Sequence, residues 1–291
     1  MAETVYRDYT REELDKQYSN FLQEGAETTH QEATARCLAN RDALSPETGI
    51  AYGAHADEVF DLYRADAPGA PAIIYMHGGQ WQKGDAAMSA IAADTARAQG
   101  VAWVAAHCRQ IPDVRLPDMV DQTVAAIHHV RANAATLGID PTRLCVAGHS
   151  SGGHLAGAAL VRLANEDDLA GIACGMLISG NYDLRPLMLS YRADYLKLSE
   201  DETVALSPLL TLKKPLPPVW FTVGSIESDE FKRQTRTFHE AVSKLGAATL
   251  RINEGRNHFN ANDELRDAGS PAWAFLAQHL GLAPAASAAA Q

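Results

Sequence analysis

The chain has 291 residues, of which 46% are hydrophobic, so it can form a sizeable core in one large α/β domain or in two small ones. Its formal net charge of -11 argues against nucleic acid or an anionic membrane surface as a partner. No apolar run approaches the length of a membrane span, and the first residues lack the apolar stretch of a secretory signal, so we expect a cytoplasmic protein.

The first part of the chain is predicted to be helical. A capping-box pattern, Thr10 followed by Glu13, opens a helix whose apolar face would comprise Leu14, Tyr18, Phe21 and Leu22. A second helix is predicted at 31–44, and residues 45–55 are expected to form a loop. We expect both helices to pack over the sheet or near the mouth of the site.

From residue 58 the pattern alternates between strands and helices. Apolar runs predict strands at 59–63, 72–76, 101–106, 144–147, 172–178, 219–223 and 249–252. Helices are predicted between them at 86–99, 119–137, 153–164, 230–245 and 262–279. This alternation, with nearly unbroken apolar strands, predicts an α/β fold with a mostly parallel central sheet and helices on both faces. Ligands bind such sheets at the carboxyl ends of the strands.

Two segments depart from this alternation. Residues 181–216 contain short helical pieces, and we expect them to form a small insertion that covers the carboxyl end of the sheet as a lid. Residues 283–291 are of low complexity and are expected to be disordered. Because no repeat or internal linker is visible, we expect residues 1–282 to form a single domain.

The strand predicted at 72–76 is followed by the sequence HGGQW at 77–81. Loops of this type accompany a nucleophilic serine in α/β-hydrolases, because their backbone N–H groups can stabilise an oxyanion. Each such donor contributes about 3–4 kcal/mol to catalysis. We therefore predict Gly78 and Gly79 as oxyanion-hole donors. His77 is expected to hold the loop by hydrogen bonding rather than to act as a base.

The strand predicted at 144–147 leads into a G-x-S-x-G turn whose central residue is Ser150. This turn places the hydroxyl of Ser150 over the end of the sheet, and it places the N–H of Ser151 at a helix N-terminus as a third oxyanion donor. The flanking residues must be glycine, because a side chain at Gly148 or Gly152 would strike the neighbouring strand or helix. The alternative is a glycine-rich turn without chemistry.

A nucleophilic serine needs a base, and the base needs an acid that orients it. In this class the three follow in the order serine, acid, histidine. His239 and His279 lie in predicted helices, whereas His258 lies in a polar loop after the last strand, so we predict His258 as the base. The acid is expected after the sixth strand. Glu227 is the preferred candidate and Asp229 the alternative, since Asp229 also fits the first turn of the next helix.

The remaining sequence gives no sign of a metal or another cofactor. Four cysteines are scattered without a C-x-x-C pair, at Cys37, Cys108, Cys145 and Cys174. We interpret them as reduced thiols in a reducing compartment. No clustered set of His, Asp and Glu that would bind a metal is visible.

Together these motifs resemble the arylformamidase (kynurenine formamidase) group of the α/β-hydrolases, close to the hormone-sensitive-lipase-like esterases. The resemblance covers residues 9–280 and includes YTREELDKQY at 9–18, HGGQW at 77–81, GHSSGGHL at 148–155, SGNYDLRPL at 179–187, SPL at 207–209 and ESDEFKRQ at 227–234. The chain departs from the family where Glu227, Ser151 and Gln80 replace the common Asp, Ala and Tyr. The resemblance implies an α/β-hydrolase fold and hydrolysis of N-formyl-L-kynurenine to kynurenine and formate.

The expected chemistry is acyl transfer, in which Ser150 attacks a formamide or ester carbonyl while His258 removes its proton. Trp81, Tyr182 and Phe259 are candidate substrate-binding residues that could form an aromatic wall, although each also fits a place in the core. Two other functions stay open: a carboxylesterase, lactonase or amidase with a different small substrate, and a non-catalytic binding protein on a hydrolase scaffold. We expect a small-molecule substrate as the partner, and the sequence leaves room for a homodimer.

Overall fold

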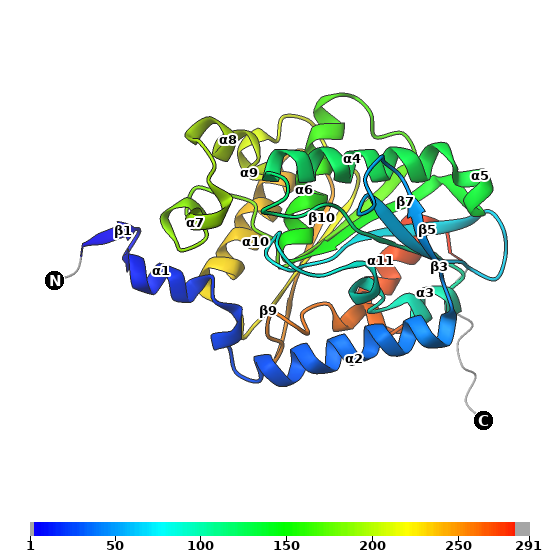
Figure 1. Cartoon of the computed structure of the whole chain (residues 1–291), viewed down its shortest axis with the longest axis horizontal. Coiled ribbons are helices and arrows are strands. Elements are labelled where there is room, and N and C mark those ends of the chain that lie inside the picture. The colour runs from blue at the N-terminus through cyan, green and yellow to red at the C-terminus, as the bar shows by residue number, and fades with distance from the viewer. Residues whose placement is uncertain (1–2, 283–291) are drawn as a thin grey trace.

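A sheet of eight strands forms the centre of the computed structural model, which describes residues 3–282 (Figure 1). The strand order is β10-β9-β8-β7-β5-β6-β4-β3. In chain order the strands are β3 (Glu47–Ala51), β4 (Val59–Tyr63), β5 (Ala70–Met76), β6 (Ala102–Ala106), β7 (Ile139–His149), β8 (Ile172–Ile178), β9 (Val219–Gly224) and β10 (Ala248–Asn253).

The sheet is parallel from β10 to β6, and β4 and β3 extend it with antiparallel pairs. Every residue of β5, β6 and β9 is buried, as expected for parallel strands that are covered on both faces. Each predicted strand is present. The loop predicted at 45–55 is wrong in part, because it contains β3. This edge strand is mostly exposed and has no apolar run to mark it.

Helices cover both faces of the sheet (Figure 1). One face packs against α4 (Leu116–Ala132), α6 (Ser151–Asn165) and α10 (Asp229–Ser243). The other packs against α2 (Ala26–Leu44), α3 (Ala93–Ala98) and α11 (Pro271–Leu280). The predicted α/β fold with a mostly parallel sheet is therefore confirmed.

Three of the predicted helices are interrupted. The helix predicted at 86–99 consists of the 3-10 helix η2 (Ala86–Ser89) and α3, and the one at 119–137 consists of α4 and α5 (Ala134–Leu137). The helix predicted at 262–279 is wrong in its first part, where η4 (Asp263–Arg266) stands apart from α11. Pro271 begins α11 because proline lacks the N–H that a helix interior needs, and Ser270 caps the new start.

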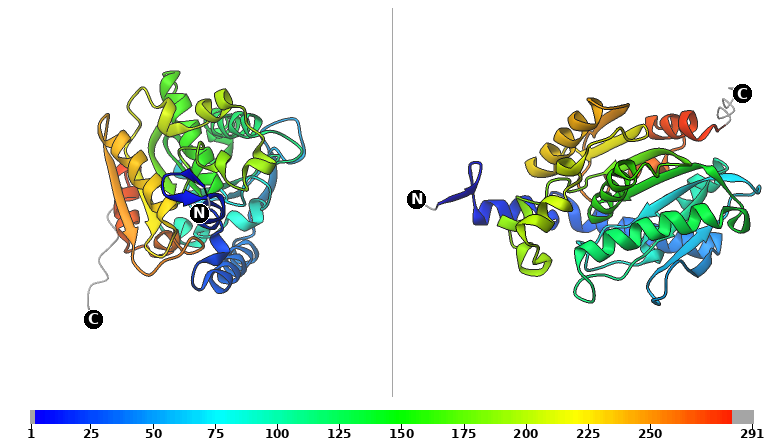
Figure 2. Two further views of the ribbon diagram at one scale, coloured as in Figure 1. Left: turned by 90° about the vertical axis from the view of Figure 1, so that its left-hand side faces the viewer. Right: turned by 90° about the horizontal axis from the view of Figure 1, so that it is seen from above.

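The N-terminal segment extends from the body of the molecule (Figure 2). It contains β1 (Thr4–Tyr6), β2 (Tyr9–Thr10), α1 (Arg11–Gln17) and η1 (Asn20–Leu22). The predicted capping box of Thr10 and Glu13 is present at the start of α1.

The expected apolar face of the first helix is correct only in part. Leu14 and Tyr18 are buried, but Phe21 is 51% exposed and Leu22 is 68% exposed. The reason is that α1 ends at Gln17, so Phe21 and Leu22 do not continue its helical face. The next helix, α2, starts before the predicted position and runs along one side of the sheet (Figure 1).

The insertion segment (residues 181–216) contains η3 (Leu187–Leu189), α7 (Ala193–Leu196), α8 (Glu200–Ala205) and α9 (Pro208–Thr211). It is joined to α1, where the N–H of Tyr191 donates to Oδ1 of Asp15 at 2.6 Å, and to α6, where the amide of Asn165 donates to the carbonyl of Thr211 at 2.9 Å. Its function as a lid stays a prediction.

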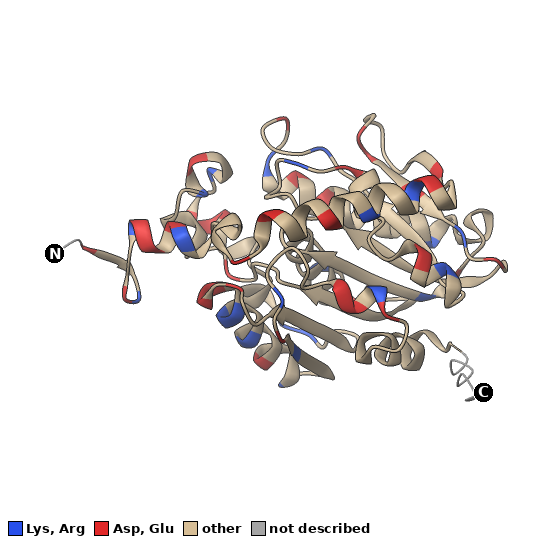
Figure 3. Cartoon of the chain, turned by 90° about the horizontal axis from the view of Figure 1, so that it is seen from below, with Lys and Arg blue, Asp and Glu red and all other residues tan. Residues whose placement is uncertain are grey.

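Charged residues of both signs are spread over the helices and loops, whereas the ribbons of the central strands are mostly uncharged (Figure 3). All four cysteines are free and buried. Across residues 3–282, none of the helices combines the length and apolar character that crossing a bilayer requires. The segment predicted to be disordered, 283–291, lies outside the described residues.

Candidate active site

Ser150 occupies the tip of the sharp turn between β7 and α6. Its backbone angles, φ 59° and ψ −124°, lie in a region that side chains disfavour, at a cost of about 1–3 kcal/mol. Backbone hydrogen bonds hold the turn, since the N–H of Ser150 donates to Ile178 at 2.9 Å and its carbonyl accepts from His154 at 3.0 Å. The hydroxyl is thereby fixed above the carboxyl end of the sheet.

The two glycines of the turn are required by close backbone contacts. A Cβ on Gly148 would lie 2.2 Å from the carbonyl oxygen of Gly152, at the start of α6. A Cβ on Gly152 would lie 2.1 Å from the carbonyl oxygen of Met76, at the end of β5. These contacts are the steric reason anticipated from the sequence, because α6 starts directly against the neighbouring strand.

The structure brings Ser150, His258 and Glu227 together. The hydroxyl of Ser150 donates to Nε2 of His258 at 2.8 Å, and Nδ1 of the same ring donates to Oε2 of Glu227 at 2.7 Å. All three residues are buried, with exposed fractions of 6%, 1% and 1%. They follow β7, β10 and β9, so three parallel strands deliver them to one end of the sheet.

Glu227 is held as a carboxylate by its second oxygen. Oε1 accepts hydrogen bonds from the hydroxyl of Ser179 at 2.5 Å and from the N–H of Gly224 at 2.8 Å. Burial opposes ionisation, but the His258 ring and these two donors outweigh it, so the pKa of Glu227 is lowered. The charged carboxylate can therefore orient the imidazole and stabilise its protonated form.

The structure does not bring the alternative acid to the histidine. Asp229 begins α10, its side chain is 76% exposed, and it pairs with Lys232 at 3.0 Å. A turn closed by the N–H of Glu227 and the carbonyl of Gly224, 3.2 Å apart, directs residue 227 inward instead.

The glycine loop after β5 lies against Ser150. A Cβ on Gly78 would lie 3.0 Å from Cβ of Ser150, and a Cβ on Gly79, whose φ is 129°, would overlap the carbonyl oxygen of Lys83. Within residues 3–282 the N–H groups of Gly78, Gly79 and Ser151 donate to no acceptor. These three predicted donors thus remain available for a substrate oxygen.

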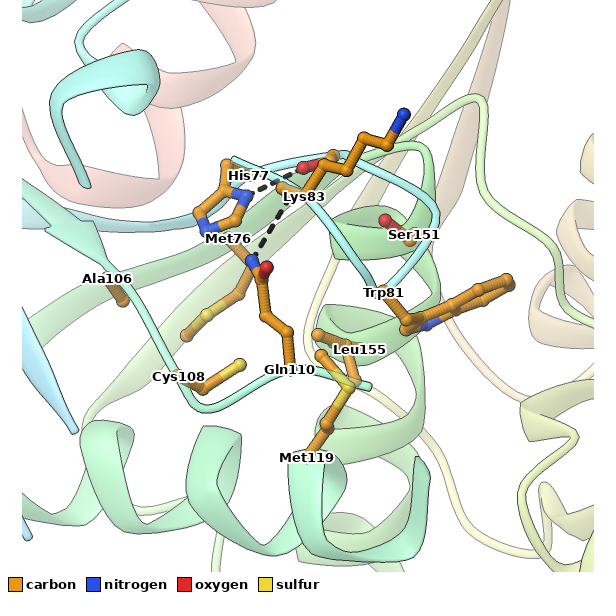
Figure 4. A pocket seen from close by; sticks show the side chains of 11 residues that line it. Met76, His77, Trp81, Lys83, Ala106, Cys108, Gln110, Met119, Ser151 and Leu155 are labelled. Atoms are coloured by element: carbon orange, nitrogen blue, oxygen red, sulfur yellow. Dashed lines mark hydrogen bonds between the residues drawn. The ribbon is translucent and has the colours of Figure 1, made fainter. Parts of the chain in front are cut away.

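His77 fastens this loop from the side, as the sequence suggested. Its Nδ1 donates to the carbonyl of Gly78 at 2.6 Å, and its Nε2 accepts from Nδ1 of His107 at 3.0 Å. Burial, together with His107, lowers the pKa of His77 to about 4, so the ring is neutral at pH 7. Under the loop, Met119 and Leu155 line a residual cavity of about 10 Å³, and the Lys83 amine points away from it (Figure 4).

Trp81 anchors the far end of the loop. Its indole N–H donates to Nδ1 of His154 at 3.2 Å, and Nε2 of His154 donates to the carbonyl of Leu206 at 2.8 Å. The guanidinium of Arg192 lies 5.9 Å from the centre of the indole ring. The loop is therefore connected through α6 to the insertion segment.

A cavity of about 540 Å³ opens onto Ser150 and His258. It is bounded by the glycine loop, by α2 and by the segment around η1, and its volume lies in the range of small-ligand sites. Phe21, His30 and Phe259 form an aromatic cluster in its wall, with Phe259 4.6 Å from Phe21 and 4.8 Å from His30 between ring centres.

The structure corrects two of the three expected aromatic contacts. Phe259 lines the cavity, but Tyr182 is fully buried and packs on Phe238 with ring centres 4.8 Å apart. Trp81, 1% exposed, turns towards His154 and does not line the large cavity. Both were placed near the site by sequence position, which does not reveal side-chain direction.

Many cavity residues were not predicted for the site, among them Phe21, His30 and His149. Phe21 was expected on the apolar face of the first helix, but it lies in the short turn η1 that follows α1. His149 stood inside the serine motif and could have been singled out as a polar residue adjacent to the nucleophile.

Comparison with known proteins agrees with this fold. Residues 73–260 match a family model described as alpha/beta hydrolase fold. A kynurenine formamidase of Salmo salar is 25% identical over 279 residues, which cover 90% of this chain and 94% of that protein. An isoprenylcysteine alpha-carbonyl methylesterase of Arabidopsis thaliana is 26% identical over 236 residues, covering 72% of this chain and 55% of that protein.

A solved structure has the same overall fold. A candidate thioesterase from Silicibacter sp. tm1040 superimposes with a TM-score of 0.79 and 28% identity, over 91% of this chain and 98% of that one. The resemblance to kynurenine formamidases inferred from the motifs is thereby confirmed, and the protein is a hydrolase of the esterase type.

Proposed function

Since this chain belongs to the α/β-hydrolase fold family, we propose that it is a serine hydrolase that cleaves a small aryl formamide or ester of the N-formylkynurenine type. The observation that carries the proposal is the hydrogen-bonded series from Ser150 through His258 to Glu227, with separations of 2.8 and 2.7 Å. The similarity to kynurenine formamidases favours a formamide substrate.

The first half of the reaction forms an acyl-enzyme. The oxygen of Ser150 bonds to the substrate carbonyl carbon while its proton passes to Nε2 of His258, and Glu227 stabilises the resulting imidazolium. The carbonyl oxygen becomes an oxyanion that accepts hydrogen bonds from the N–H groups of Gly78, Gly79 and Ser151. When the oxyanion collapses, the C–N or C–O bond breaks and His258 gives its proton to the departing atom.

The second half releases the acid. Water takes the place of the amine or alcohol, His258 removes its proton, and the oxygen bonds to the acyl carbon of the esterified Ser150. The second tetrahedral species uses the same donors. Its collapse breaks the bond to Ser150, which regains its proton from His258, and a formyl substrate leaves as formate.

The cavity supports an aryl substrate that carries an amino-acid group. The cluster of Phe21, His30 and Phe259 offers a surface on which an aromatic ring can stack. At the rim, the exposed Lys83 and Asp85 supply one cation and one anion. A zwitterionic substrate would find an opposite charge for each of its ends.

A carboxylesterase with another small substrate is the second candidate. It is favoured by the similarity to a methylesterase, and by Gln80, which stands in the loop that borders the cavity. An ester and a formamide would use the same nucleophile and the same oxyanion donors, so the triad geometry supports both.

The proposal is tested by a substrate panel and a nucleophile variant. We expect release of formate from N-formyl-L-kynurenine with a kcat/KM above that for phenyl acetate, measured by mass spectrometry. Ser150→Ala should lower kcat by about a millionfold while circular dichroism stays unchanged. A folded Ser150→Ala protein with full activity would refute the nucleophile, and a higher kcat/KM for phenyl acetate would favour the carboxylesterase.

A further inference from the structure

His149, which directly precedes the proposed nucleophile, takes no part in the mechanism above. Its Nε2 lies 2.7 Å from the backbone carbonyl oxygen of His258. A carbonyl oxygen can only accept, so Nε2 must carry the hydrogen. The neutral ring therefore presents a lone pair at Nδ1, and this tautomer is fixed by the backbone rather than by another titrating group.

The ring stays neutral in the active range of pH. Burial is the main cause, and the neighbouring His258 adds to it, so the pKa of His149 falls to about 3. A protonated ring would place two cations side by side, since the centres of the two imidazoles are 4.8 Å apart.

The Nδ1 atom of His149 lies next to the reacting groups. A Cβ built on Gly78 would stand 3.4 Å from this Nδ1 and 3.0 Å from Cβ of Ser150. His149 lines the 540 Å³ cavity, and its Nδ1 makes no hydrogen bond to the part of the chain that the structure describes. An acceptor without a partner among residues 3–282 therefore lies beside the reacting groups, in the wall of the cavity that Ser150 and His258 also line.

We propose that Nδ1 of His149 accepts a hydrogen bond from the N–H of the scissile amide and so favours amides over esters. This inference rests on the proposed function and names its substrate class: secondary amides, and aryl formamides in particular.

The chemistry of the reaction explains why such an acceptor favours amides over esters. When Ser150 attacks, the C–N bond loses its double-bond character and the nitrogen lone pair turns towards the proton on His258. The hydrogen already on the nitrogen, which stays in the product amine, must then point elsewhere, and Nδ1 of His149 can receive it. The corresponding oxygen of an ester carries no hydrogen and would present a lone pair to another lone pair.

Two variants separate the acceptor at Nδ1 from the hydrogen bond that Nε2 donates to the carbonyl of His258. His149→Gln can still donate an amide N–H to the carbonyl of His258, but it has no acceptor at the place of Nδ1. His149→Asn has a carbonyl oxygen near the place of Nδ1, but it is too short to reach the carbonyl of His258. Both are compared with the wild-type protein on formanilide, phenyl formate and N-methylformanilide, with phenyl formate corrected for spontaneous hydrolysis.

We expect His149→Gln to lower the ratio of kcat/KM for formanilide to that for phenyl formate by about tenfold. His149→Asn should lower both values and keep their ratio within about threefold. The wild-type protein should prefer formanilide to N-methylformanilide, which lacks the N–H, and His149→Gln should lose most of this preference. An unchanged ratio in His149→Gln overturns the inference, and so does an equal loss for both substrates.

Failure of the proposed function would look different. If the wild-type protein cleaves phenyl formate through Ser150 but cleaves no formamide, the formamide assignment fails. The hydrogen bond from the amide N–H to His149 is then tested by using formanilide as an inhibitor. Formanilide should then inhibit phenyl formate cleavage with an inhibition constant that rises about tenfold in His149→Gln. An inhibition constant that does not rise overturns the inference. If either variant fails to fold, the wild-type preference for formanilide over N-methylformanilide decides alone.

Discussion

At the scale of single residues, Glu227 is the point where this chain departs most clearly from the family pattern. The longer side chain reaches Nδ1 of His258 with one oxygen and both Ser179 and Gly224 with the other. An aspartate would be one methylene shorter and could not keep all three contacts without a shift of the loop. The extra length is thus matched by the donors that surround it.

Removing the negative charge of residue 227 should therefore slow the reaction. Glu227→Gln should lower kcat by about 10⁴-fold, because a neutral amide no longer fixes the tautomer of His258 or stabilises its protonated form. Glu227→Asp should retain more activity than the glutamine variant, since the charge remains. The measurement is kcat on the preferred substrate with near-UV circular dichroism as the folding control. Equal activity of Glu227→Gln and the wild-type protein would show that the acid lies elsewhere.

A second prediction concerns Phe21, whose ring packs against Phe259 at the cavity wall. Phe21→Ala should raise the KM of aryl substrates about fivefold, the loss of roughly 1 kcal/mol of aromatic contact, and leave kcat nearly unchanged. Leu22→Ala is the matched control, because Leu22 is adjacent, 68% exposed and outside the cavity lining. A similar change of KM in both variants would argue against a direct contact with substrate.

The residues of the site differ in how far sequence could reveal them. Ser150 and His258 follow from a motif and from chain order. Glu227 and Asp229 lie close together in the sequence after β9, and only the turn closed on Gly224 directs residue 227 inward. The helix of Phe21 was expected over the sheet or near the mouth of the site, but the direct contact of Phe21 with the cavity was not predicted, because the sequence did not show that α1 ends at Gln17.

At the scale of elements, the oxyanion loop depends on partners from distant parts of the chain. Gln80 and Trp81 both have positive φ values, 59° and 62°, so the loop is strained and needs support. That support comes from His154 on α6, which binds the indole of Trp81 and the carbonyl of Leu206. The position of the donors is therefore set by α6 and the insertion segment together.

This connection predicts a loss of rate rather than of affinity. Trp81→Phe removes the N–H that reaches His154, so the loop should relax and kcat should fall about tenfold while KM changes little. Labelling by a fluorophosphonate should slow in parallel, because it uses the same donors. His154→Asn keeps an acceptor for Trp81 and should be milder than His154→Leu. A rise in KM without a change in kcat would contradict this function of Trp81.

The secondary structure shows which elements the hydrophobic pattern of the sequence could predict. The central strands could be predicted because they are buried on both faces and therefore apolar throughout. The edge strand β3 could not, since most of its residues face solvent. The helix expected at 262–279 failed at Pro271, where backbone chemistry overrides an apolar pattern.

At the scale of the whole molecule, the end of the sheet that holds the site also holds several histidines that are kept neutral by burial. Burial lowers the pKa of His154 to about 4 and, together with neighbouring histidines, lowers that of His77 to about 4 and that of His149 to about 3. Each ring uses its neutral form to hold the oxyanion loop or the loop of His258. The same arrangement that positions the site should therefore make the fold sensitive to acid.

The direction in which the free energy of unfolding changes with pH follows from how many protons the folded and unfolded states bind. In the unfolded chain these histidines take up protons near pH 6.5, whereas in the folded protein they do so only near pH 3 to 4. The unfolded state thus binds more protons between these limits, and the free energy of unfolding should fall as the pH drops from 6.5 to 4, by about 1.4 kcal/mol per pH unit for each histidine. The lowered pKa of Glu227 adds a further loss only below its ordinary value of 4.5.

Urea unfolding at pH 7, 6 and 5 measures this slope directly. Replacing His154 by Asn removes one of the three groups while leaving a partner for Trp81, so the variant should be less stable at pH 7 but should lose less stability between pH 6.5 and 5. The control is Leu22→Ala, which changes an exposed side chain and removes no titrating group, and its slope should match that of the wild-type protein. If the free energy of unfolding stays constant from pH 7 to 5, these rings are not held neutral by the fold, and the unprotonated Nδ1 assigned to His149 loses the support of its lowered pKa.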